Sequence, residues 1–177
     1  MKAIDFTNVP DQQDNDFKRM VSGAYICKIE SVQDIAEKEY LKIEYDIAEG
    51  QLKGYYADLF ERRQFWGGRF IRSYKDTALS FFKGFISAIS NSNQGFAWTS
   101  NEQQLVGKKF GAVIAEEEYM KANGEVGTRF YVAETRSVDA IRKGDFKVPD
   151  KKLLKVKANA PFTASDFGVD VENLPFK

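Results

Sequence analysis

The chain has 177 residues, of which 43% are hydrophobic and 29% are charged, and its 26 basic residues equal its 26 acidic ones in number. This length and composition are typical of one globular domain with short appendages. The chain has no histidine and a single cysteine, which excludes Ser-His and Cys-His catalysis and argues against a zinc site. No apolar run is long enough to span a bilayer. We therefore expect a cytosolic protein that is not an enzyme and needs no metal or cofactor.

The first part of the chain predicts an arm followed by three strands. Residues 1–20 show no hydrophobic periodicity, so we expect them to form the arm. Alternation of apolar and polar side chains predicts strands over residues 24–33 and 40–48. Gly50 and Gly54 indicate a turn, and a third strand is predicted over residues 55–60.

The second part changes from strand to helical periodicity and back. Apolar residues recur every three or four positions over residues 73–91, which predicts a helix with one buried stripe. Strands are predicted over residues 105–116 and 128–137, and Asn123-Gly124 between them is typical of a hairpin turn. From residue 147 the chain becomes rich in lysine and then acidic, which predicts a linker and tail over 147–177.

Three strands, a helix and two further strands are the element order of the OB-fold. The sequence therefore predicts an all-β domain over residues 21–146, a five-stranded Greek-key barrel with one helix between its third and fourth strands. The alternative is another small α+β or barrel fold.

Residues 60–75 combine cations with aromatic rings. Guanidinium groups neutralise phosphates and flat rings stack on unpaired bases, so this mixture favours binding of single-stranded nucleic acid. The candidate residues here are Phe65, Trp66, Arg62, Arg63, Arg69 and Arg72. The alternative is that the rings close one end of the barrel and the arginines form a solvated rim.

A second group of candidates lies on the expected second and third strands. Alternation places one of Tyr55 and Tyr56 outward as a stacking residue and the other in the core. Lys53 precedes them, and Lys42 points outward from the second strand, where it either contacts phosphate or is simply solvated. Strands two and three form the ligand face of an OB-fold.

Three segments, residues 40–50, 65–74 and 137–147, resemble a protein family encoded by phages and prophages of low-GC Gram-positive bacteria. Its members are described as uncharacterised or as single-stranded DNA-binding proteins of the replication-recombination module. The resemblance covers about residues 15 to 150 and carries no catalytic signature. It implies an OB-fold that protects single strands in the host cytoplasm during phage replication.

The end of the chain resembles the acidic C-terminal tip of bacterial single-stranded DNA-binding proteins, which closes in Ile-Pro-Phe. The matching residues are Asp170, Glu172, Leu174, Pro175 and Phe176. The resemblance implies recruitment of replication and recombination proteins through this tail. Here the acids are sparser than in the bacterial tip, and Lys177 follows Phe176.

We therefore expect a binder of single-stranded DNA without strong sequence preference that forms a homo-oligomer. The alternative is a protein-interaction module, such as a replication adaptor or host-factor inhibitor, that uses the same basic and aromatic patch and binds no nucleic acid.

Overall fold

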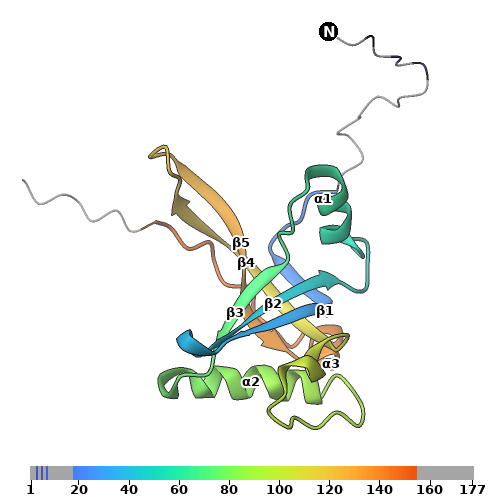
Figure 1. Ribbon diagram of the computed structural model, residues 1–177, viewed down its shortest axis with the longest axis vertical. Coiled ribbons are helices and arrows are strands. Elements are labelled where there is room, and N and C mark those ends of the chain that lie inside the picture. Colours follow the sequence, from blue (N-terminus) through green and yellow to red (C-terminus); the bar gives the residue numbers. More distant parts are fainter. Residues whose placement is uncertain (1–2, 4, 6, 8–17, 155–177) are drawn as a thin grey trace, which may run out of the picture.

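The computed structural model describes residues 3, 5, 7 and 18–154 (Figure 1). Its five strands are β1 (Gly23–Ile35), β2 (Tyr40–Ile47), β3 (Arg69–Ser73), β4 (Lys109–Met120) and β5 (Val126–Arg136). The α-helices are α1 (Tyr55–Arg63), α2 (Leu79–Ser90) and α3 (Val138–Lys143). Short 3-10 turns cover Ala36–Lys38, Asp76–Ala78 and Glu102–Leu105.

The strands form a single antiparallel sheet in the order β3-β2-β1-β4-β5. The sequence predicted a five-stranded Greek-key barrel, and the coarser part of that prediction, a mostly-β domain with one five-stranded sheet, is confirmed. The sheet is open, because β3 and β5 are its two edge strands and no described residue pairs one with the other. Figure 1 shows the β4–β5 hairpin extending well beyond the other strands.

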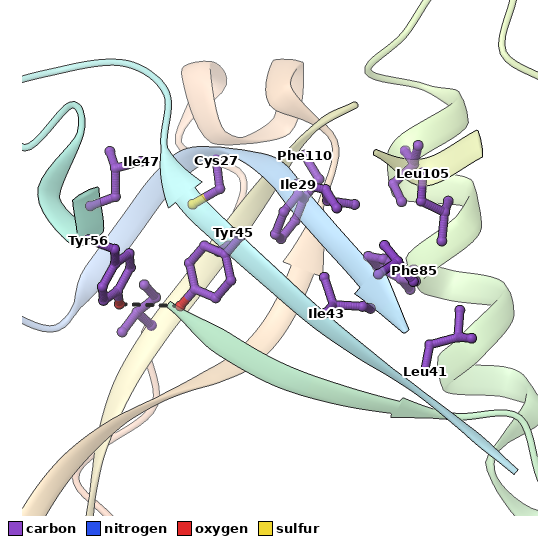
Figure 2. Packing of buried hydrophobic residues seen from close by; sticks show 14 of the residues in the cluster. Cys27, Ile29, Leu41, Ile43, Tyr45, Ile47, Tyr56, Phe85, Leu105 and Phe110 are labelled. Carbon is purple, nitrogen blue, oxygen red and sulfur yellow. Dashed lines mark hydrogen bonds between the residues drawn. The ribbon is translucent and has the colours of Figure 1, made fainter. Parts of the chain in front are cut away.

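The core lies on one face of the sheet, with α2 over one end and α1 over the other. Leu41, Ile43 and Tyr45 alternate along β2 and all point into it (Figure 2). Phe85 of α2 is completely buried against this face, and Tyr56 of α1 closes the opposite end. The alternation of β2 thus specifies a face that two separate helices cover.

The expected third strand is wrong, because residues 55–60 lie in the helix α1. The helix is stabilised by Asp46 of β2, which is buried and accepts hydrogen bonds from the backbone N–H groups of Tyr56 (2.9 Å) and Ala57 (3.1 Å). Gly54 at the start of α1 has no side chain to cap the helix itself. The cap comes from another element, so local sequence gives little sign of it.

The true third strand, β3, lies inside the cation- and ring-rich segment 60–75, where no strand was predicted. It pairs with β2 from Tyr40↔Ser73 to Glu44↔Arg69. Gly68 precedes it at a close approach, since a Cβ atom there would collide with the Tyr45 carbonyl oxygen and the Tyr56 ring. The glycine therefore allows the close packing of β3 against β2 and α1. The structure also has three α-helices among its described residues, where one was expected.

The segment that follows α3 packs back onto the sheet. Lys152 forms a parallel bridge with Glu117 of β4, through hydrogen bonds to the backbone of Glu116 (3.0 Å) and Glu118 (2.8 Å). The first part of the predicted linker, up to Leu154, therefore adds to the part of β4 that extends past β1.

Candidate nucleic-acid interface

A groove of about 610 Å³ lies between the two edge strands of the sheet. Residues of β2, β3, β4 and β5 line it, so its walls are regular elements and not loops. The lining residues are Tyr40, Lys42, Arg69, Phe70, Ile71, Glu117, Arg129, Phe130, Tyr131 and Val132. A groove held by strands keeps its shape when a ligand enters.

The groove exposes flat and apolar side chains to solvent. Phe130 is 38% exposed and Ile71 is 54% exposed, which is unusual for large apolar residues on strands. Tyr40 and Tyr131 are half-buried and add two further rings. Rings held at a surface in this way are the platforms on which unpaired bases stack.

Three cations line the same groove, and two of them are ion-paired. Arg69 contacts Glu44 at 3.0 Å, and Arg129 contacts Glu117 at 2.8 Å. No ion pair of Lys42 is found within the described residues. A phosphate entering the groove thus meets Lys42 directly and competes with carboxylates for the two arginines.

A fourth cation stands at the edge of the groove. The Lys152 ammonium group lies 4.1 Å from the centre of the Tyr131 ring, a cation–π distance. Its neighbour Lys151 is paired with Glu118 at 2.9 Å. The lysine-rich segment after α3 therefore places the Lys152 charge against a ring of the groove, whereas the Lys151 charge neutralises the Glu118 carboxylate of β4.

Of the site residues predicted from sequence, the structure places Lys42 and Arg69 in the groove. Arg72 is half-buried and does not line the groove, so the structure does not bring it together with Lys42 and Arg69. Its guanidinium lies over the rings of Phe70 (5.2 Å) and Phe85 (5.9 Å), on the core side of β3. Burial lowers the pKa of Arg72, and its Nε has no hydrogen-bond partner within the described part of the chain.

Of the pair Tyr55 and Tyr56, Tyr56 is the core residue and so does not stack on a base. It is 5% exposed, and its hydroxyl lies 3.4 Å from that of Tyr45. Trp66 also packs inward, with its ring 6.4 Å from Tyr56 and 6.3 Å from Phe60, and its Nε1 donates to the Gly68 carbonyl at 3.1 Å. For Trp66, the alternative of a ring closing one end of the core fits the structure better.

The remaining predicted residues lie on and around α1. Lys53, Tyr55 and Arg62 line a hollow of about 110 Å³, together with Lys18. Arg63 is exposed at the end of α1, and Phe65 is 59% exposed in the loop that leads to Arg69. None of these residues lines the groove between β3 and β5, although Phe65 lies only four positions before Arg69.

Sequence reasoning missed the contribution of β5, namely Arg129, Phe130 and Tyr131. The hairpin carries an acidic run over residues 116–118, which would repel phosphate if its charges were unpaired. In the structure those acids are used locally, with Glu117 paired to Arg129 and Glu118 to Lys151. The available signal was the Arg-Phe-Tyr sequence itself, which repeats the mixture of cation and ring seen in residues 60–75.

Other kinds of site find no support in the described residues. No group of three or more metal-ligating side chains occurs there, and none of the helices is long and apolar enough to cross a membrane. The predicted tail residues Asp170, Glu172, Leu174, Pro175 and Phe176 lie outside the described part of the chain. Neither the protein-family models nor the curated proteins give a match to this sequence.

Proposed function

We propose that this protein binds single-stranded DNA, without strong sequence preference, in the groove between β3 and β5. The observation that carries the proposal is the convergence of exposed rings and cations from three strands on one groove of about 610 Å³. Stacking on rings such as Phe130 accepts any base, while Lys42 and Arg69 contact phosphates that carry no sequence information.

The fold we propose is an OB-fold whose barrel is left open between β3 and β5. In support, α2 follows β3 and precedes β4 along the chain, and the order β3-β2-β1-β4-β5 is that of a barrel cut between its third and fifth strands. The groove would then lie at the opening of the barrel.

The biological setting rests on the family resemblance stated above. We place the protein in the host cytoplasm during phage DNA replication or recombination, where it protects single strands as a binding protein and not as an enzyme. The tail from Asp170 to Phe176 recruits replication and recombination proteins. Self-association is part of this proposal, because one small domain contacts only about 4–16 nucleotides.

Removing a groove ring tests the stacking. The Phe130→Ala variant should bind oligo-dT about 5- to 150-fold more weakly, since stacking contributes roughly 1–3 kcal/mol per base. The measurement is fluorescence anisotropy of labelled oligo-dT. Phe81→Ala is the matched control, because Phe81 is 71% exposed on α2 and does not line the groove. Equal affinities of the two variants would contradict the assignment of the groove.

The second candidate function is a protein-interaction module, and the pairing of Arg69 with Glu44 and of Arg129 with Glu117 favours it. A surface that neutralises its own cations attracts polyanions less. The salt dependence separates the two functions: affinity for oligo-dT should fall steeply with salt, and Lys42→Ala should reduce the slope by about one. An absence of oligo-dT binding at low salt would favour the interaction module.

A further inference from the structure

A second cavity, of about 320 Å³, opens on the other face of β2 from the groove. Leu41 lines this cavity, whereas its neighbours Tyr40 and Lys42 line the groove, and adjacent strand residues point to opposite faces. The lining residues are Asp34, Leu41, Tyr74, Leu79, Phe82, Trp98, Ser100 and Glu102. The cavity therefore belongs to the end of the sheet where α2 begins.

Three aromatic rings form one wall of this cavity. The Tyr74 and Phe82 ring centres are 6.1 Å apart, and those of Phe82 and Trp98 are 6.0 Å apart, both pairs meeting edge to face. All three side chains are only partly buried although they pack on the core. Leu79, at 46% exposure, adds an apolar surface at the rim.

Carboxylates surround these rings. The Tyr74 hydroxyl donates to Asp34 at 2.8 Å, and this hydrogen bond raises the pKa of Tyr74. Glu102 lines the same cavity as Asp34, and the Glu39 carbonyl accepts a hydrogen bond from the Tyr74 backbone N–H at 2.9 Å. The negative charges of Asp34, Glu39 and Glu102 raise the pKa of Tyr74 further. Two acids line the cavity, and no lysine or arginine is among its described lining residues.

We propose that this cavity binds an arginine or lysine side chain of a partner protein, presented by a basic peptide segment with an adjacent apolar residue. Aromatic faces attract organic cations, and Asp34 and Glu102 supply the opposite charge. Leu79 contacts the neighbouring apolar side chain. Because the same negative charge repels phosphate, the cavity does not serve nucleic acid, and this inference stands apart from the function proposed for the groove.

An NMR titration tests the proposal directly. The probe is the blocked peptide Gly-Arg-Leu-Arg-Gly, and the readout is the indole N–H signals of Trp98 and Trp66, the two tryptophans of the chain. The Trp98 signal should shift with the peptide while that of Trp66 stays in place. The same peptide with glutamine, or with glutamate, in place of arginine should shift it far less. Equal shifts with all three peptides would overturn the proposal.

Charge removal provides the second arm. Glu102→Gln keeps the shape of the cavity and the bond between Asp34 and Tyr74, and it should weaken binding of the arginine peptide about three- to tenfold. Glu125→Gln is the matched control, because Glu125 is paired with Lys121 on the β4–β5 hairpin and does not line the cavity. An unchanged affinity in Glu102→Gln, with the Trp98 signal still shifting, would also overturn the proposal. Binding of oligo-dT, measured on the same samples, reports on the groove separately.

Discussion

At the scale of single residues, Tyr45 and Tyr56 form a closely packed, buried pair. Their hydroxyl oxygens lie 3.4 Å apart, and their rings meet edge to face with centres at 5.4 Å (Figure 2). Burial raises the pKa of both phenols, because an ionised phenolate cannot be solvated there. The pair joins α1 to β2 and so ties one end of the core together.

These raised pKa values predict a loss of stability in alkali. A phenol whose folded-state pKa exceeds the unfolded value of about 10 stabilises the folded state below pH ~10, and that contribution is lost as the pH rises further. We therefore expect unfolding to accompany ionisation of these two residues. Parallel titrations of tyrosine absorbance and circular dichroism check this. Tyrosine ionisation that is complete before any unfolding would contradict it.

The burial of a side chain was predictable from sequence where the periodicity of its own strand or helix determines it. It was not predictable where the side chain packs against residues from distant parts of the chain. The burial of Leu41, Ile43 and Tyr45 follows from alternation alone. Arg72 and Trp66 look like ligand residues in the sequence, yet one lies over Phe85 and the other packs against Phe60. Only the fold decides whether a cation or ring beside glycines faces solvent or core.

At the scale of elements, α1 depends on a cap supplied by β2. The Asp46 carboxylate accepts from the N–H groups of Tyr56, Ala57 and Ile47, the last at 2.7 Å. These are charge-assisted bonds in a buried place, where an unsatisfied N–H group is costly. One side chain therefore joins the end of β2 to the first turn of α1.

Removal of this carboxylate should destabilise the fold. Asp46→Ala leaves buried N–H groups without acceptors, at a cost of about 1–3 kcal/mol or more in the free energy of unfolding. Urea denaturation followed by circular dichroism gives the value. The matched control is Glu61→Ala, an exposed acid of the same helix, which should change stability by less than about 0.5 kcal/mol. Equal effects of the two substitutions would show that Asp46 does not act as a cap.

Four of the five strands, and the helix α2, were predicted near their observed positions, since long stretches with a clear period specify them. The third strand was misplaced for a physical reason. Residues 55–60 are compatible with strand or helix, and the cap from Asp46 favours the helix only after β2 has formed. β3 has only five residues, of which the first and the fourth are arginines. Its alternation of apolar and polar side chains is therefore too short to identify a strand.

At the scale of the whole molecule, the sheet separates two surfaces of opposite character. The groove between β3 and β5 carries Lys42, Arg69 and Arg129, whereas the cavity beside α2 carries Asp34 and Glu102. They share the strand β2 but use its opposite faces. On the two proposals made above, the protein would hold a polyanion and a basic partner at the same time.

Simultaneous binding is the corresponding prediction. Protein saturated with oligo-dT should bind the arginine peptide with an affinity within about twofold of that of the free protein, because the two sites share no lining residue and open on opposite faces of β2. Isothermal titration calorimetry in both orders of addition provides the measurement. Strong mutual exclusion would show that the two ligands compete for one surface.

The return of the chain onto β4 also determines where the residues after Leu154 begin. Lys152 is bridged to Glu117 and lies over Tyr131, both of which line the groove, and the Leu154 N–H donates to Glu118 at 3.2 Å. The described part of the chain therefore ends beside Glu118, one residue from the groove-lining Glu117. We propose that the acidic residues that follow in the sequence compete with DNA as an attached ligand would. On the proposed function, the tail acts as a built-in competitor that DNA must displace, so it sets a threshold for binding without altering the groove.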